Sequence, residues 1–370
     1  MTISPKSSVK LDSTPSAVRR ALRKSWRWLL GLSGVLLAWH ALQGVAWPAV
    51  WDLLAGISPL AILIIVVINL ALIPLMTARW WLLLKTLGSP VSLLSICAYR
   101  TATNAVNYLT PGPHFGGEPL SVYLLHHRHG ITLSSAATSV AVDRLLELLA
   151  SFVVLTLCLI NLSFAESGPF KENQGLFLVI ALLAVLTCTL ATLFTGGRPL
   201  SRSIFLFKRF CGKPATSISG QNGSLIDIII QVETMAEKLF RGHPYQFLLA
   251  NLLSFCHWFG VFVEFWLMSA FLGFPLSFGH LTAVVVVARL AFLTPLPAGI
   301  GVLESALPWM TATLGLGSAL GISLCLIIRF RDLVFSLAGL GLTMKYLTCP
   351  RKLSIISNTF RSEGTNDLPK

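Results

Sequence analysis

The sequence predicts an all-α polytopic membrane protein, and three observations support that prediction. The chain has 370 residues, of which 54% are hydrophobic and only 12% are charged. Its apolar residues gather in long segments that each supply the roughly 20 residues a helix needs to cross about 30 Å of hydrocarbon. The net charge of +13 comes from basic residues grouped in blocks beside those segments. A soluble domain of this size would need far more polar surface.

Six transmembrane helices are predicted along the chain. They are expected at about residues 28–46, 59–84, 133–162, 174–195, 246–272 and 318–347. The basic blocks lie in the N-terminal tail 1–27, in the loop 196–245 and in the C-terminal tail 348–370. Six crossings place all three blocks on one side of the membrane, which the positive-inside rule identifies as the cytoplasm. Both termini are therefore expected to be cytoplasmic, and this topology explains the basic charge better than nucleic-acid binding does.

Two further apolar stretches are each interrupted by a helix-breaking phrase. The phrases are LTPGPHFGGE at residues 109–118 and LTPLPAGIGVLE at residues 293–304. The limb after the first phrase has about 11 residues, or about 16 Å of helix, which is too short to cross. Irregular backbone inside a bilayer is tolerated only where protein or a watery cavity covers it. We therefore predict two re-entrant hairpins whose tips meet in the interior; interfacial loops between full spans are the alternative.

The order of these elements indicates an internal repeat. Residues 59–162 form repeat A and residues 246–347 form repeat B, each consisting of a long span, a broken hairpin and a charged long span. Three crossings separate the starts of the two repeats, so the halves are expected to be inverted in the membrane. Short segments broken by Gly and Pro at corresponding positions of two halves point to a substrate site near the midplane.

Eleven ionisable side chains fall within the predicted spans and hairpins. Leaving all of them unpaired would cost roughly 30 kcal/mol on insertion scales, so most must pair or face water. We interpret Arg144, Glu147 and Arg331 as salt-bridge partners that lock the repeats together. The residues that we assign to a substrate pathway are Arg100, Asn104, Asn107, Gly116, Gly117, Glu118, Asp143, Arg144, Glu147, Arg289, Pro297, Gly299, Gly301, Glu304, Arg329 and Asp332.

The hairpin breaks predict an anion site. Helix N-termini at residues 116–119 and 299–301 are expected to present free N–H groups, which favour phosphate or another anion. The glutamates beside them, Glu118 and Glu304, either pair with an arginine or carry a proton that drives transport. No cofactor or metal is predicted. For the cluster at residues 126–129, three histidines and an arginine, we favour lipid headgroup contact over metal binding.

Several phrases resemble a known family. ARWWLLLKTLG (78–88), NAVNYLTPGPHFGGEPLSVYLL (104–125), VDRLLE (142–147), LTPLPAGIGVLE (293–304) and RFRDL (329–333) are similar to the transmembrane, flippase-like domain of lysylphosphatidylglycerol synthases. Hopanoid-associated relatives consist of this region alone. The resemblance covers about residues 28–347 and implies translocation of a modified lipid between leaflets. The positions that match the family's motifs are Glu118, Asp143, Arg144, Glu147, Glu304 and Arg329.

The resemblance also indicates a difference from the synthases. Those proteins carry a large soluble aminoacyl-transfer domain after the membrane part, whereas about 20 polar residues follow the last span here. We therefore expect this chain not to synthesise the lysyl lipid, and we expect a transporter instead of an enzyme. No phosphate-binding Gly-rich loop with Lys-Ser/Thr is present, so an ion gradient or downhill movement would have to supply the energy.

The sequence favours a flippase-like protein of the bacterial inner membrane. Its expected cargo is a phosphate-bearing or modified lipid, such as a phospholipid, a polyprenyl carrier or a hopanoid-type lipid. Membrane lipids are the expected partners, with a lipid-modifying enzyme as a further candidate and no nucleic acid. The main alternative is a membrane-embedded transferase or its accessory subunit, with Glu118 or Asp143 as general base. A solute channel or transporter is a third alternative.

Overall fold

The computed structural model describes residues 32–43, 45–110, 116–163, 225–294 and 296–348, together with residues 180, 184 and 187. All regular secondary structure in this part of the chain is helical. Residues 32–43 form a helix. The helices that follow are α2 (Trp47–Ala55), α3 (Pro59–Thr86), α4 (Leu93–Leu109), α5 (Glu118–His129), α6 (Leu133–Ser163), α9 (Leu225–Gly242), α10 (Pro244–Phe271), α11 (Phe278–Phe292), the 3-10 turn η1 (Pro297–Gly299), α12 (Val302–Thr313) and α13 (Ser318–Thr348).

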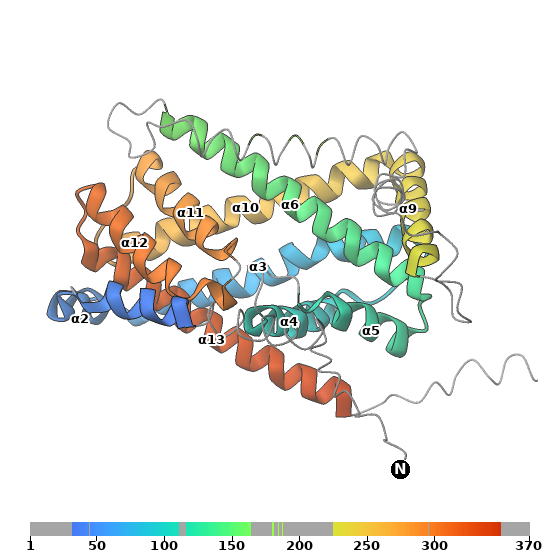
Figure 1. Ribbon diagram of the computed structural model, residues 1–370, viewed down its shortest axis with the longest axis horizontal. Coiled ribbons are helices and arrows are strands. Elements are labelled where there is room, and N and C mark those ends of the chain that lie inside the picture. Colours follow the sequence, from blue (N-terminus) through green and yellow to red (C-terminus); the bar gives the residue numbers. More distant parts are fainter. Residues whose placement is uncertain are drawn as a thin grey trace, which may run out of the picture.

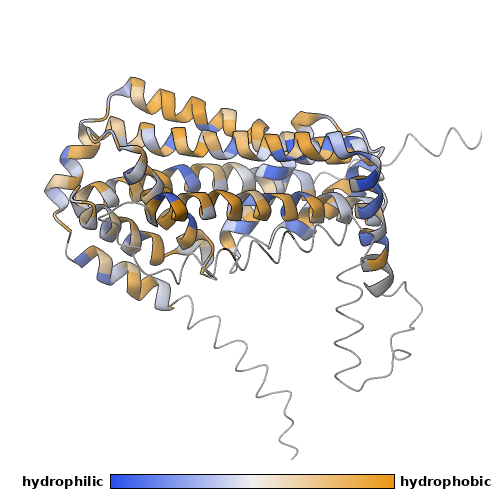
Figure 2. Cartoon of the chain, turned by 90° about the horizontal axis from the view of Figure 1, so that it is seen from above, coloured by the Kyte–Doolittle hydropathy of each residue, from blue (hydrophilic) through white to orange (hydrophobic). Residues whose placement is uncertain are grey.

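Within the described residues, three helices are long and apolar enough to cross a membrane: α3, α6 and α10. Helix α13 has 31 residues, but its middle carries Arg329, Arg331 and Asp332. Hydrophobic residues cover most of the long helices, and hydrophilic residues concentrate at one end (Figure 2). The chain is therefore a multi-pass membrane protein. The predicted span 28–46 is described only in part, and nearly all of 174–195 lies outside the described residues, so the number of six spans stays a prediction.

The turns that follow α3 and α10 share one sequence and one geometry. Residues 87–92 and 272–277 both read Leu-Gly-x-Pro-x-Ser. Gly88 has a φ of 73° and Gly273 a φ of 85°, a left-handed conformation that glycine adopts without steric cost. The serine that ends each motif accepts a hydrogen bond from the backbone N–H three residues later and so caps the next helix. These local signals fix where α4 and α11 begin.

Each of these turns leads into a broken pair of short helices. The pair α4 and α5 has 17 and 12 residues, and the pair α11 and α12 has 15 and 12 residues. In Figure 1 the first pair lies toward the end of the molecule that α9 covers, and the second lies toward the opposite end, near α2. Helices α3 and α10 pack against each other and run in opposite directions. Residues 111–115 and 295 of the two breaks lie outside the described residues.

Helix packing joins the two sets of helices. Helix α4 packs on α13, α11 packs on α6, and each charged long helix also packs on the hairpin that precedes it. At the α4–α13 crossing, a Cβ added to Gly339 would collide with the backbone of Thr101 and the side chain of Ala105. The largest hydrophobic core lies among α6, α10, α11, α12 and α13, and includes Leu155, Val284 and Leu303. A smaller one around Trp80 joins α3 to α6.

Helix α9 changes the predicted picture of residues 196–245. We expected a cytoplasmic loop there, whereas residues 225–242 form an 18-residue helix. It runs across the ends of the long helices in Figure 1. Ala236 and Leu239 are buried together with Leu83 and Leu146, so its apolar face covers the ends of α3 and α6. This helix is too polar to span the membrane, but it is amphipathic enough to pack on the ends of the long helices.

Candidate functional site

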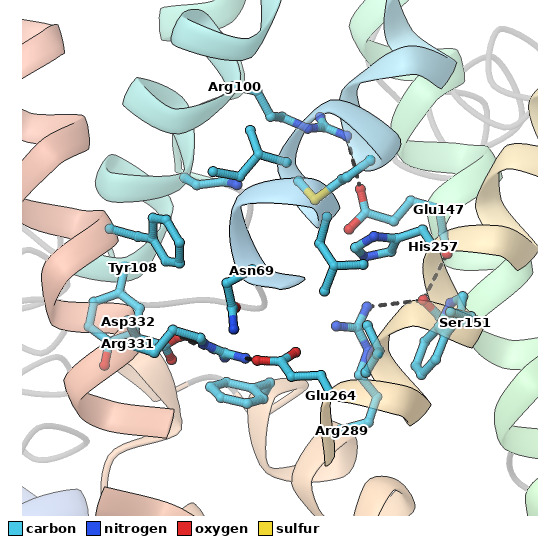
Figure 3. Close-up of a pocket in the computed structure, with 18 of the residues that line it drawn as sticks. Asn69, Arg100, Tyr108, Glu147, Ser151, His257, Glu264, Arg289, Arg331 and Asp332 are labelled. Atoms are coloured by element: carbon cyan, nitrogen blue, oxygen red, sulfur yellow. Dashed lines mark hydrogen bonds and ion pairs between the residues drawn. The ribbon is translucent and has the colours of Figure 1, made fainter. Parts of the chain in front are cut away.

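A cavity of about 340 Å³ lies in the middle of the long helices. Residues of α3, α4, α6, α10, α11 and α13 line it, and Figure 3 shows their side chains directed into one space. Its wall carries five arginines, Arg79, Arg100, Arg144, Arg289 and Arg331, and three carboxylates, Glu147, Glu264 and Asp332. Charged groups at this depth are costly and mark candidate functional sites in membrane proteins.

Asp143 of α6 is the centre of the first ion network. Its Oδ1 accepts from Arg79 Nε of α3 at 2.7 Å, and its Oδ2 lies 2.7 Å from Arg100 Nη1 of α4. The Asp143 side chain is 1% exposed and each arginine side chain 5%. A carboxylate buried so completely must be paired, and two guanidinium groups from two other helices satisfy this requirement.

Glu147 and Glu118 extend this network. Glu147 lies one turn beyond Asp143 on α6 and contacts Arg144 Nη1 at 2.9 Å and Arg79 Nη2 at 3.3 Å. Glu118, the first residue of α5, binds Arg144 Nε at 2.8 Å. Three arginines and three carboxylates therefore connect α3, α4, α5 and α6. Arg144 and Glu147 form salt bridges, as predicted, but all of these partners belong to residues 59–162, so the bridges connect helices of the first half and do not lock the two halves together.

Arg79 was missed by the sequence analysis. It is 4% exposed and uses all three of its nitrogens, because Nη1 also donates to Ser254 Oγ of α10 at 2.9 Å. Its position near the end of an apolar span resembles an arginine that extends to the membrane surface. The signal that could have revealed it is helical spacing: Asn69, Met76 and Arg79 share the face of α3 that lines the cavity.

A second cluster occupies another wall of the cavity. Arg331 of α13 lies 2.5 Å from Glu264 Oε1 of α10 and 2.7 Å from Asp332 Oδ1. Asp332 was expected on the pathway, and it lines the cavity. Glu264 both lines the cavity and pairs with an arginine of another helix. One arginine with two carboxylates gives this wall a surplus negative charge.

Arg329, the third residue of this region, joins the second hairpin instead of lining the cavity. Its Nε contacts Glu304 Oε1 at 2.6 Å, and its Nη1 donates to the Ala298 carbonyl at 2.7 Å and to Tyr108 Oη at 3.3 Å. Glu304 and Arg329 therefore hold the tip of the second hairpin against α13 and against the end of α4. We expected both at the substrate pathway; neither is among the residues that line the cavity.

At the hairpin tips, two of the backbone N–H groups that we expected to be free for an anion are already hydrogen-bonded. Gly117 N–H donates to Asn107 Oδ1 at 2.5 Å, and Gly301 N–H donates to Glu304 Oε2 at 2.7 Å. Neither group is free, because the hairpin's own side chains satisfy them. Gly116 also packs against Thr110, with no room for a Cβ. Gly299 and Gly301 have φ values of 63° and 87°, so glycine there serves the turn's backbone. Pro297 begins η1.

The polar side chains of Arg100, Asn104 and Asn107 lie along one side of α4, but they have two different roles. Asn107 holds the tip of the first hairpin, while Arg100 and Asn104 line the cavity. Asn104 is exposed to this space. Of the predicted pathway residues, those in the cavity wall are Arg100, Asn104, Arg144, Glu147, Arg289 and Asp332, and the other ten lie behind it or at the hairpin tips.

Arg289 of α11 differs from the other cavity arginines. Its Nη2 donates to Ser151 Oγ at 3.0 Å, and its guanidinium lies 5.2 Å from the centre of the Trp258 ring. Within the described part of the chain it forms no ion pair with a carboxylate, and its Nε is buried without a hydrogen-bond partner. Figure 3 shows it facing the same space as His257 and Glu264. This wall therefore has a surplus positive charge.

The histidine cluster lies apart from the cavity. His129 Nε2 lies 2.9 Å from Tyr99 Oη, and His126 Nδ1 lies 2.8 Å from the Ile131 carbonyl oxygen. Among the described residues there is no group of three or more His, Cys, Asp or Glu side chains placed to hold a metal ion. These histidines instead secure the end of α5.

Comparison with known proteins gives the family. Residues 26–339 match the model of the family described as the lysylphosphatidylglycerol synthase TM region. A UPF0104 membrane protein of Methanocaldococcus jannaschii is 24% identical over 254 residues, which cover 68% of this chain and 74% of the relative. A UPF0104 membrane protein of Methanothermobacter thermautotrophicus is 24% identical over 262 residues, covering 68% of this chain and 75% of the relative. No solved structure matches the chain.

Proposed function

The chain belongs to the lysylphosphatidylglycerol synthase transmembrane-region family, and from this premise we propose that it is a flippase-like protein of the inner membrane. It moves a lipid with a polar, phosphate-bearing headgroup between the leaflets, and it does so without chemical change to the lipid. The headgroup passes through the charged cavity while the acyl chains stay in hydrocarbon. Membrane lipids are its partners, together with the enzyme that modifies the cargo.

Arg289 is the observation that supports this proposal most. Arg289 is partly buried in the cavity wall, and an arginine in this position without a carboxylate partner is costly to keep in a membrane protein unless another anion reaches it. A phosphate group could accept two hydrogen bonds from its planar guanidinium, in a geometry that lysine cannot match. The cavity presents this group beside Ser151 and Trp258. We assign Arg289 the role of binding the phosphate in transit.

The arrangement of the helices supports alternating access. The two sets, α3 to α6 and α10 to α13, have nearly equal helix lengths and the same turn sequence after the first helix. They also pack on each other reciprocally, α4 on α13 and α11 on α6. We propose that they are inverted repeats, with one hairpin entering from each face of the membrane. In secondary transporters, rocking of one such repeat against the other exposes a fixed central site to each side in turn.

The transferase alternative has less support. Glu118 and Asp143, its candidate general bases, are both held by arginines at 2.7 to 2.8 Å. Both carboxylates are therefore already engaged in ion pairs with guanidinium groups. We propose that these groups support the cavity wall. The liposome experiment has an outcome that would favour the enzyme instead.

The test is lipid translocation by purified protein in liposomes. Phosphatidylglycerol and phosphatidylethanolamine with fluorescent labels on the acyl chain report movement when a membrane-impermeant reagent quenches only the outer leaflet. Arg289→Gln is the test variant, because it breaks no ion pair and should leave the fold intact. We expect translocation to slow at least about tenfold, since a charge-assisted hydrogen bond is worth about 1.5 to 3 kcal/mol. Arg241→Gln, on exposed α9, is the matched control and should not change the rate.

The outcomes separate the three functions. Unaltered lipid that moves between leaflets, with loss of movement in Arg289→Gln, supports the flippase. A chemically altered lipid supports the transferase. If wild-type protein neither moves nor alters a lipid, the proposed function is wrong and the solute transporter becomes the leading alternative.

A further inference from the structure

A second cavity of about 410 Å³ lies between α6, α10 and α11. It is an apolar groove, and three residues at its margin are strongly exposed: Leu157 is 60% exposed, Phe259 71% and Phe278 67%. Its polar lining is limited to Asn161 and Thr282, whose side chains contact each other at 3.4 Å. On the surface of a membrane protein, such a groove faces hydrocarbon chains.

The groove follows the charged cavity along one face of α6 and one face of α11. On α6, Ser151 lines the cavity, and Val154 and Cys158, three and seven residues further on, line the groove. On α11, Arg289 lines the cavity and Thr282 the groove, seven residues apart, which is about 10 Å along the helix. Residues three, four and seven apart share one face of a helix. Along α6 and α11 the lining of the groove therefore follows that of the cavity, and Arg289 and Ser151 are among the cavity residues nearest to the groove.

In the other half of the molecule, the helix crossing that corresponds to α6 with α11 is tightly packed. Helices α4 and α13 correspond to α11 and α6, and Gly339 of α13 contacts the backbone of Thr101 there. Thr343 Oγ1 also donates to the Ala102 carbonyl of α4 at 3.5 Å. The groove therefore belongs to the α6–α11 crossing, and it is not a consequence of the similarity between the two halves.

We propose that this groove holds one acyl chain of the lipid whose headgroup occupies the charged cavity. The inference rests on the proposed function and adds the route: cargo enters and leaves sideways between α6, α10 and α11. A phosphate at Arg289 places the start of an acyl chain at the inner end of the groove. The groove then keeps the chain on apolar side chains while the headgroup is among charges, which avoids exposing the chain to the polar cavity.

The test is a matched pair of tryptophan substitutions at lipid-facing leucines. Leu157→Trp fills the groove, whereas Leu337→Trp changes a leucine of α13 that is 61% exposed and lines neither cavity. Binding of palmitoyl-oleoyl phosphatidylglycerol to purified protein is measured by native mass spectrometry, with glycerol phosphate as the probe without acyl chains. We expect about tenfold weaker lipid binding in Leu157→Trp, the effect of displacing about two methylenes, and unchanged binding in Leu337→Trp.

A second measurement uses the wild-type protein, so its result does not depend on whether a variant folds. Phosphatidylglycerol with a photoreactive diazirine in its acyl chain is cross-linked, and labelled peptides are identified. We expect label on residues 154–161 and 259–266, and competition by unlabelled lipid. Equal binding in both tryptophan variants, or label spread evenly over lipid-facing helices, would overturn the groove. If wild-type protein translocates lipid in either of those cases, the proposed function stands; label in the groove without translocation contradicts only the function.

Discussion

The two halves of the molecule pair their buried charges in different ways. In the first half, Arg79, Arg100 and Arg144 share Glu118, Asp143 and Glu147 in one continuous network. In the second half, Arg329 pairs with Glu304, and Arg331 forms a separate set with Glu264 and Asp332. The centre of the first network is almost fully buried, while the arginines of the second half are 17% and 21% exposed.

This difference indicates different mechanical roles. In the shared network, the loss of Asp143 or Glu147 removes a partner from two or more arginines at once, so the helices that carry them can separate only at high cost. Separate pairs at the edge of a cavity can exchange partners, with water or a headgroup replacing a lost contact. We therefore expect α3 to α6 to act as the rigid part and the second hairpin with α13 to move. The following substitutions test that comparison.

Asp143→Asn should have the largest effect. It removes the charge nearest to both Arg79 and Arg100, and breaking one side of a buried pair costs about 3 to 5 kcal/mol. The measurement is the apparent melting temperature and the folded yield of purified protein in detergent. We expect a severe loss of both, so a loss of transport in this variant would reveal little about the pathway.

Asp332→Asn is its counterpart in the second half. Arg331 keeps Glu264 at 2.5 Å, and Asp332 is 14% exposed, so the loss should be about 1 kcal/mol. Equal destabilisation by the two substitutions would show that both halves are locked in the same way, and the proposed division into rigid and moving parts would be wrong.

A pair of glycines on α13 tests the closed crossing. Gly339→Ala places a Cβ against the backbone of Thr101, whereas a Cβ at Gly341 meets nothing within 4 Å. We expect the first change to destabilise by about 1 to 3 kcal/mol because the helices must shift. The second should stabilise by up to about 1 kcal/mol through helix propensity. Thermal unfolding of both variants checks this, and the same sign for both would contradict the tight contact of α4 with α13.

Glu304→Gln should have an effect similar to that of Asp332→Asn. The amide can still accept from Gly301 N–H, but Arg329 loses its charged partner, so we expect about 1 kcal/mol of destabilisation. Glu237→Gln on α9 breaks a more exposed pair, with Arg241 at 3.3 Å, and should cost about 0.3 to 0.5 kcal/mol. The comparison is made by thermal unfolding at low and high salt, since only the exposed pair should be sensitive to salt.

The sequence predicted the helices accurately where the signal is local. Helices occupy the four segments expected at 59–84, 133–162, 246–272 and 318–347, namely Pro59–Thr86, Leu133–Ser163, Pro244–Phe271 and Ser318–Thr348. Apolar length and the position of glycine and proline determine such boundaries, and both are properties of a short stretch of chain. Helix α9 was missed because its mixture of polar and apolar residues resembles a loop until the surface on which it packs is known.

The sequence by itself determined the membrane class, the charged positions and the two hairpin breaks. Only the tertiary structure decided which charges meet. Asp143 joins Arg79, 64 residues earlier, and Glu264 joins Arg331, 67 residues later. Hydropathy measures whether a segment favours lipid, whereas an ion pair depends on the separation of two side chains in space. Helix packing sets that separation, and for the same reason Arg289, the one pathway arginine without a carboxylate among the described residues, could be recognised only after its neighbours were placed.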